Sequence, residues 1–158
     1  MTEAELEGYM KKYYACVYSA ALCCCKNPAD ADDTAQEVFL KLYLYNGTFA
    51  GEEHIKAWLI KCAVNRSINL LRSYWYRFSR PLDAAVSKTA DSESDSLLYC
   101  IERLEKKNRI AMYLYYYEGY STKETADILG ISEAAVRSRI ARGKKQLKKI
   151  IESEETDL

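Results

Sequence analysis

The side chains best able to do chemistry in this sequence are basic, and the first cluster of them lies between His54 and Arg80. This stretch carries six Lys or Arg residues and no acid, with aromatic residues interleaved. On a helix that turns about 100° per residue, the polar face is formed by Lys61, Asn65, Arg66, Asn69, Arg72 and Tyr76. An ordinary solvated face would usually mix acids with bases. A face of cations, amides and rings is suited to single-stranded nucleic acid, because these groups bind phosphates, base edges and base planes.

A second basic cluster follows a helix-turn-helix pattern from Ser121 to Ile140. Ser121 or Thr122 can cap a first helix, Gly130 can end it in the left-handed conformation, and Ser132 can cap a second helix. The second helix has an apolar side made of Val136, Ile140, Leu147 and Ile151. Its polar arc contains Arg137, Ser138, Ala141, Arg142, Lys145, Lys148 and Lys149. The pattern favours DNA binding, and a helical hairpin for protein contacts is the alternative.

Other chemistries find little support in the residue pattern. The six cysteines include no CxxC pair, and His54 is the only histidine, whereas a zinc site needs about four ligands at suitable spacing. Glycine-rich phosphate loops are absent from the sequence as well. We therefore expect no metal and no cofactor, with the cysteines reduced and serving as small apolar residues.

Composition and charge limit the class of protein further. The 158 residues are 49% apolar, with 23 basic and 23 acidic residues, which is enough for a folded core. No run approaches the roughly 20 apolar residues of a membrane span, and the acidic start of the chain is unlike a signal peptide. A cytoplasmic chain is therefore expected.

Helical periodicity runs through most of the sequence, so the elements that position both clusters are expected to be helices. The predicted fold is all-α: two small helical domains joined by a flexible acidic linker, the second a helix-turn-helix domain. The predicted domains are residues 1–80 and 97–151, with a linker at 81–96 and an acidic tail at 152–158. The predicted helices cover about 2–26, 29–45 and 53–76 in the first domain, and 95–117, 122–129 and 133–151 in the second.

Three motifs, in order along the chain, resemble those of bacterial RNA polymerase sigma factors of the extracytoplasmic-function (group four) type. Asp30–Leu42 (DADDTAQEVFLKL) is similar to the family's D-A-E-D-x-x-Q-E-x-F-L-x-L signature. Trp58–Asn69 is similar to its W-L-x-x-I-A-x-N-x-x-x-[DN] helix, and Gly119–Arg142 to its C-terminal helix-turn-helix. The chain departs from the family pattern at Thr125, Ala134-Ala135 and Gly143, and Gly143 weakens a helix by up to about 1 kcal/mol.

The resemblance implies a protein that is not an enzyme, and that binds core RNA polymerase and directs it to promoter DNA. The first motif would dock on the β′ clamp helices, and the β subunit is a further implied contact. Of its residues Asp32, Asp33, Gln36 and Glu37 would supply charge and hydrogen bonds, while Phe39 and Leu40 are expected to pack. Macrodipole complementarity alone would explain the acids at the helix start but not Gln36 and Glu37. An anti-sigma factor is a partner that the resemblance allows without requiring it.

The same resemblance assigns DNA contacts to both basic clusters. The minus-ten element would be held by Phe49, Lys61, Asn65, Arg66, Asn69 and Arg72, with Phe49 at a loop that holds a flipped base. Phe49 as a core anchor of that loop is the alternative. The minus-thirty-five element would be read from the major groove by Arg137, Ser138, Arg139, Arg142 and Lys145, with Arg139 on a phosphate or in an intramolecular pair.

Two other classes of function remain as alternatives. A helix-turn-helix repressor with a helical effector domain would bind duplex DNA without polymerase, as a symmetric dimer. A protein-interaction module would not need the uninterrupted basic face at 54–80. The discriminating observation is whether affinity for promoter DNA requires core polymerase.

Overall fold

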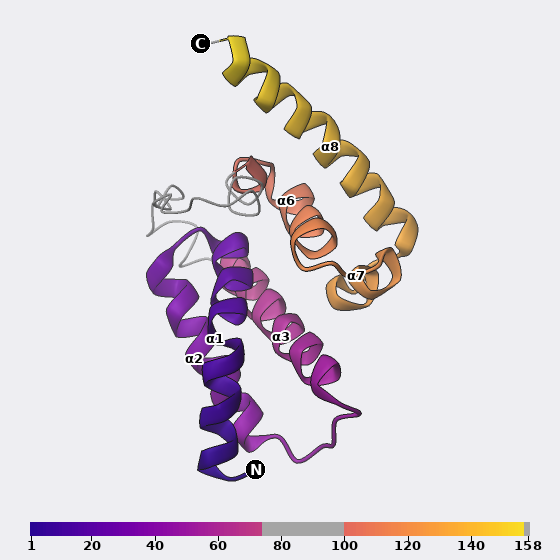
Figure 1. Cartoon of the computed structure of the whole chain (residues 1–158). Coiled ribbons are helices and arrows are strands. Elements are labelled where there is room, and N and C mark those ends of the chain that lie inside the picture. The colour runs from indigo at the N-terminus through magenta and orange to yellow at the C-terminus, as the bar shows by residue number, and fades with distance from the viewer. Residues whose placement is uncertain (74–99, 157–158) are drawn as a thin grey trace. The chain divides into compact units, whose positions relative to one another are not determined.

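The computed structural model describes residues 1–73 and 100–156, and in these ranges every regular element is a helix. The chain divides into two compact units, Met1–Val86 and Ser87–Leu158 (Figure 1). The prediction of an all-α fold is confirmed. The boundary between the units falls inside the predicted linker 81–96, which lies outside the described residues. None of the described helices is long and apolar enough to cross a membrane.

The first unit is a bundle of three helices that pack against one another, α1 (Glu3–Cys25), α2 (Pro28–Leu44) and α3 (Glu52–Arg72) (Figure 1). Local signals set their ends. Thr2 forms a capping box with Glu5, and Asn27 accepts a hydrogen bond from the Asp30 backbone with Pro28 in the first turn. Between α1 and α2 the chain turns at Lys26, which has a left-handed backbone with φ 55°.

The start of α3 uses a different device, because Gly51 has no side chain to cap it. Instead, the backbone N–H of Ala50 donates a hydrogen bond of 2.9 Å to His54 Nδ1. The predicted helix over 53–76 is found as far as Arg72, and its last residues lie outside the described range. The contact gives the only histidine of the chain a structural role at the loop that precedes α3.

The second unit contains α6 (Lys106–Met112), the π-helical turn η1 (Tyr113–Tyr117), α7 (Thr122–Leu129) and α8 (Glu133–Thr156). The prediction of one unbroken helix over 95–117 is wrong, because the described part is interrupted at 103–105. There the backbone carbonyl of Leu104 accepts a 3.1 Å hydrogen bond from the buried guanidinium of Arg109. The interruption buries the Leu104 side chain and satisfies a buried cation, which an unbroken helix would not do.

The helix-turn-helix is found where the sequence predicts it. Helix α7 is preceded by the N-cap Ser121, whose side chain forms a capping box with Glu124, and is followed by the C-cap Gly130 with φ 67°. The N–H of Ala135 donates to Ser132 Oγ at the start of α8. Helix α8 continues to Thr156, beyond the predicted end at 151. Val136 and Ile140 are buried and anchor α8 in this unit, as expected.

Candidate nucleic-acid interface

A pocket of about 420 Å³ opens between α2 and α3 in the first unit. It is lined by Glu37, Val38 and Lys41 from α2 and by Trp58, Lys61, Cys62, Asn65, Arg66 and Asn69 from α3. The α3 residues recur at intervals of three and four, so they form a single stripe along the helix. Four of the six residues assigned to the minus-ten element therefore line one hollow. The other two, Phe49 and Arg72, are not among its lining residues.

The opposite side of α3 explains why this stripe faces outward. Leu59, Ile60, Ala63 and Val64 are completely buried and hold α3 against the other two helices. The hydrophobic effect thus fixes the rotation of the helix. Lys61, Asn65 and Asn69 are left exposed, with their charged and amide groups accessible to a ligand.

Cys62 lines the pocket and is half-buried. Burial raises the pKa of the Cys62 thiol, and the nearby ammonium groups of Lys41 and Lys61 only reduce that shift. Lys41 Nζ also lies 5.8 Å from the ring centroid of Trp58. The thiol therefore stays neutral near pH 7, and the cations beside it form the positive part of the surface.

Arg66 makes an ion pair that sequence reasoning missed. Its Nε lies 2.5 Å from Glu37 Oε2, and its Nη2 donates to Glu37 Oε1 at 3.3 Å. The sequence predicts different surfaces for the two residues, a DNA surface for Arg66 and a polymerase surface for Glu37. They are far apart in sequence, and only the packing of α2 on α3 brings them together.

Phe49 belongs to an aromatic cluster beside the pocket. Its ring centroid lies 5.2 Å from that of Tyr45, 5.2 Å from that of His54 and 5.6 Å from that of Trp58. The ring is half-buried, so it both anchors the loop before α3 and leaves part of its surface open. This placement is compatible with both roles considered for Phe49. Arg72 is exposed at the far end of α3.

The residues assigned to polymerase binding lie along α2 and differ in accessibility. Asp33, Gln36 and Glu37 are exposed, and Asp32 is half-buried. Tyr14 donates a hydrogen bond to Asp32 Oδ1, which raises the pKa of Tyr14 to about 12, and Gln36 donates to Asp32 Oδ2 at 3.0 Å. Asp32 is therefore held in place by α1 and by the next turn of its own helix.

Phe39 and Leu40 are adjacent in sequence but have opposite environments. Phe39 is 2% exposed and stacks on Tyr14 with ring centroids 6.0 Å apart, so the prediction that it packs is confirmed. As a buried residue it supports the surface and cannot itself contact a partner. The same prediction for Leu40 is wrong, because its side chain is 58% exposed. Three further apolar or aromatic residues near the end of α2 are also exposed, which the motif alone did not indicate: Tyr43, Leu44 and Tyr45.

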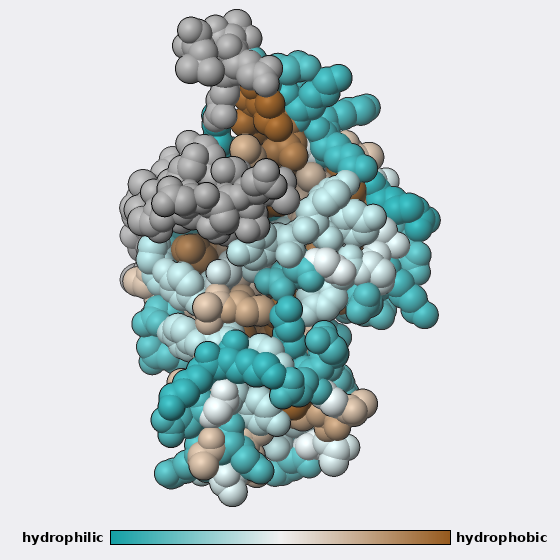
Figure 2. Space-filling model, viewed as in Figure 1, coloured by the Kyte–Doolittle hydropathy of each residue, from teal (hydrophilic) through white to brown (hydrophobic). Residues whose placement is uncertain are grey.

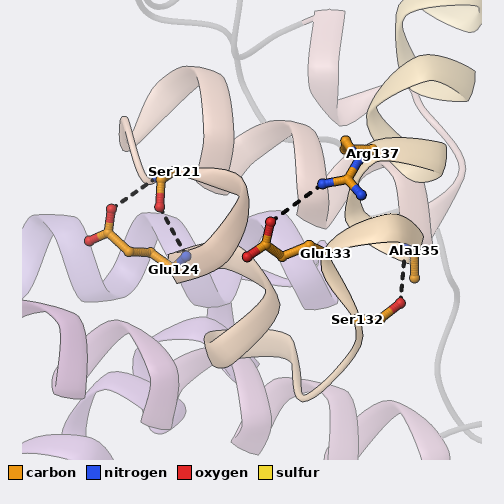
Figure 3. Close-up of polar contacts among 6 residues, drawn as sticks. All are labelled: Ser121, Glu124, Ser132, Glu133, Ala135 and Arg137. Atoms are coloured by element: carbon orange, nitrogen blue, oxygen red, sulfur yellow. Dashed lines mark hydrogen bonds and ion pairs between the residues drawn. The ribbon is translucent and has the colours of Figure 1, made fainter.

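Side-chain hydrogen bonds fix the starts of both α7 and α8 (Figure 3). Ser121 Oγ accepts from the Glu124 N–H at 3.0 Å, and Glu124 Oε1 accepts from the Ser121 N–H at 3.1 Å. One turn into α8, Arg137 pairs with Glu133 at 3.4 Å (Figure 3). The Ser132–Ala135 hydrogen bond and the Glu133–Arg137 pair lie at the start of α8, where Arg137 is exposed.

The other residues assigned to the minus-thirty-five element follow along α8. Ser138, Arg142 and Lys145 are exposed, and Arg142 Nε donates to the Ser138 carbonyl at 3.3 Å. Arg139 is half-buried and lies off this arc, as the sequence predicts. The exposed arc presents hydroxyl, guanidinium and ammonium groups on one side of a helix whose other side is anchored, which is an arrangement suited to a DNA groove.

The apolar side of α8 is only partly as predicted. Val136 and Ile140 are buried, but Ile151 is 41% exposed and lies with Leu147 in a groove flanked by Lys144 and Lys148. Figure 2 shows hydrophobic surface at the C-terminal end of α8 beside hydrophilic surface. Ile151 is therefore not part of the core, because α8 extends past the helices on which it packs.

Two known protein families match this chain, one in each of its two units. Sigma-70 region 2 matches residues 9–77, and sigma-70 region 4 matches residues 94–147. The chain is 29% identical over 126 residues to the ECF RNA polymerase sigma factor SigM of Mycobacterium tuberculosis, a match that covers 77% of this chain and 64% of SigM. It is 27% identical to the RNA polymerase sigma-E factor of Streptomyces avermitilis, over 97% of this chain and 88% of that protein.

Among solved structures, the sigma factor RpoE of Bartonella quintana, in complex with the anti-sigma factor NepR, has a TM-score of 0.74 and 16% identity. That match covers 94% of this chain and 97% of RpoE. CnrH, in complex with the cytosolic domain of CnrY, has a TM-score of 0.67 and 22% identity over 96% of this chain and 90% of CnrH. At these identities the two structures are evidence for the fold alone.

Proposed function

The chain belongs to the sigma-70 family as an extracytoplasmic-function sigma factor, and from this premise we propose that it binds core RNA polymerase, recognises promoter minus-thirty-five and minus-ten elements, and promotes DNA opening. It acts as an initiation factor in the cytoplasm, where transcription takes place, and not as an enzyme. The observation that carries the proposal is the pocket between α2 and α3, with cations and amides on one helix stripe.

The chemistry of that pocket suits an unpaired DNA strand. Lys41, Lys61 and Arg66 provide positive charge for phosphates, and Asn65 and Asn69 have both donors and acceptors for a base edge. The nearby rings of Phe49 and Trp58 offer surfaces on which a base can stack. A duplex would offer these rings no base face to stack on, because its bases are stacked on one another inside the helix.

The second unit supports recognition of duplex DNA upstream. The exposed arc of Arg137, Ser138, Arg142 and Lys145 lies on a helix that is anchored by Val136 and Ile140. A helix of this kind fits the major groove, where guanidinium groups can bond guanine edges. In this proposal the exposed α2 surface, with Asp33, Gln36 and Leu40, contacts the β′ clamp helices.

Binding measurements separate this function from that of a repressor that acts alone. We expect the isolated chain to bind promoter duplexes weakly and without marked sequence preference, since its net charge is zero. Addition of core polymerase should produce tight and promoter-specific binding in a mobility-shift assay. Tight, specific duplex binding by the chain alone would contradict the proposal and favour the repressor.

The anti-sigma factor in the RpoE complex suggests the same class of partner here. We propose that such a protein, where the source bacterium encodes one, competes with core polymerase for this chain. The competition is measured by adding the purified candidate to the chain and core polymerase in size-exclusion chromatography. Simultaneous binding of both partners would contradict it.

A further inference from the structure

The Arg66–Glu37 pair lies where the two proposed surfaces of the first unit meet. Arg66 lies on the pocket stripe of α3, and Glu37 lies on α2 beside Gln36 and one turn from Leu40. The guanidinium donates to both carboxylate oxygens, from Nε to Oε2 at 2.5 Å and from Nη2 to Oε1 at 3.3 Å. This two-pronged geometry is the one with which arginine also binds the oxygens of a phosphate.

Glu37 is the one acid among the described residues that line the pocket. The remaining charged lining residues are Lys41, Lys61 and Arg66. A DNA phosphate entering the pocket would be attracted by these cations and repelled by the Glu37 carboxylate. It would also have to displace that carboxylate from Arg66.

We propose that the Glu37 carboxylate binds the Arg66 guanidinium in place of a DNA phosphate, and so weakens single-strand binding until polymerase engages Glu37. We call this ion pair the gate. The inference rests on the proposed function and adds to it a coupling between its two partners. A cation of polymerase that pairs with Glu37 would leave the Arg66 guanidinium available to the DNA backbone. Binding of polymerase would in this way raise the affinity of the pocket for the strand.

The exposure of the two side chains makes such an exchange feasible. The Arg66 side chain is 49% exposed and that of Glu37 is 51% exposed, so either can turn to a new partner without unfolding the bundle. Ion pairs with this exposure are weak and correspond to about a two- to fivefold effect on an equilibrium. The expected coupling is therefore modest but measurable.

The test measures binding of short, labelled single-stranded DNA of random sequence to the full-length chain by fluorescence anisotropy at several salt concentrations. Glu37→Gln keeps the shape of the side chain and removes its charge. It should raise affinity about two- to fivefold above that of the unsubstituted chain. It should also steepen the salt dependence by about 0.7, the value for one added phosphate contact on a single strand.

Two further variants separate the gate from a general charge effect. Glu3→Gln makes the same change of charge at an exposed position in the first turn of α1, and it should leave affinity near that of the unsubstituted chain. In an Arg66→Gln background, Glu37→Gln should have a clearly smaller effect than in the unsubstituted chain, because only the direct repulsion between the Glu37 carboxylate and the phosphate is then removed. Equal effects of E37Q and E3Q, or an E37Q effect of undiminished size without Arg66, would overturn the proposal.

A parallel transcription assay keeps this result distinct from that of the proposed function. If core polymerase with the unsubstituted chain initiates at promoters while E37Q behaves like E3Q in strand binding, the gate alone is overturned. If polymerase with this chain neither binds promoter strands nor initiates, the proposed function fails and the gate fails with it. Increased strand binding by E37Q that depends on Arg66, together with promoter-specific initiation, supports both.

Discussion

Gly143 on α8 lies so close to Met112 on α6 that a Cβ atom at Gly143 would be 2.6 Å from Met112 Cγ. Both residues are buried, and the contact is part of the packing between the two helices. In sequence, Gly143 departs from the family pattern and is expected only to weaken the helix. The structure gives it a positive role, because the missing side chain lets α8 approach α6.

We predict that Gly143→Ala destabilises the protein although alanine is the better helix former. Overpacking costs about 1–3 kcal/mol, which exceeds the helix gain of up to about 1 kcal/mol. Gly8→Ala is the matched control, because Gly8 lies in α1 with nothing within 4 Å of an added Cβ, and it should stabilise. Urea unfolding followed by circular dichroism measures both variants.

A second substitution, at Met112, tests whether the contact with Met112 causes the destabilisation by Gly143→Ala. In a Met112→Ala background the added methyl group has room, so Gly143→Ala should no longer lower the free energy of unfolding. If Gly143→Ala stabilised the unsubstituted protein as Gly8→Ala does, this would contradict the prediction that α8 packs too closely on α6 at Met112 to admit a side chain at position 143.

Phe39 and Leu40 allow folding and partner binding to be tested at adjacent positions. Phe39→Ala should lower the free energy of unfolding by about 3–5 kcal/mol, because the ring is buried against Tyr14. Leu40→Ala should change it by less than about 0.5 kcal/mol but weaken binding to core polymerase by about 1 kcal/mol or more. Unchanged polymerase affinity of Leu40→Ala in a titration with labelled chain would remove this surface from the interface.

The caps of the helices could be predicted from sequence, whereas several contacts between helices could not. Ser121, Gly130 and Ser132 act within one turn of their own positions, so their residue types suffice. The interruption at 103–105 has no glycine or proline to mark it, since it arises from burial of Leu104 and Arg109.

In the candidate site, too, the sequence predicts features within one helix but not contacts between helices. Helical periodicity places Lys61, Asn65, Arg66 and Asn69 on one stripe, as the structure has them. The pairing of Arg66 with Glu37 depends on how α2 packs on α3. A motif contains no information about the distance between two helices, so the sequence predicts only a polymerase contact for Glu37. The exposed Leu40 was missed for the same reason, since an apolar residue in a motif predicts burial by default.

The pocket and its loop are tested by Asn65→Ala and Phe49→Ala. Both variants should lower promoter opening by about tenfold or more while they leave polymerase binding nearly unchanged, because one loses a base-edge contact and the other a stacking surface. Permanganate footprinting of the melted strand measures opening. Asn46→Ala, in the exposed turn after α2, serves as the control, and normal melting in both test variants would exclude the pocket.

Arg142 on the exposed arc of α8 is predicted to read a base. Arg142→Ala should cost about 1–3 kcal/mol and relax preference at one position of the minus-thirty-five element. Lys149→Ala should instead weaken all sequences alike and lower the salt dependence by about one unit, as expected for a phosphate contact. Binding of polymerase with each variant to single-base promoter variants at two salt concentrations distinguishes them. A uniform loss for Arg142→Ala would refute base reading.

Run-off transcription measures whether this chain directs core polymerase to promoters. Core polymerase from the source bacterium is supplied with a library of its genomic fragments, with and without the chain, and the 5′ ends of the transcripts are sequenced. We expect initiation at a small set of sites that share two upstream elements, only when the chain is present. Identical transcripts with and without the chain would contradict it.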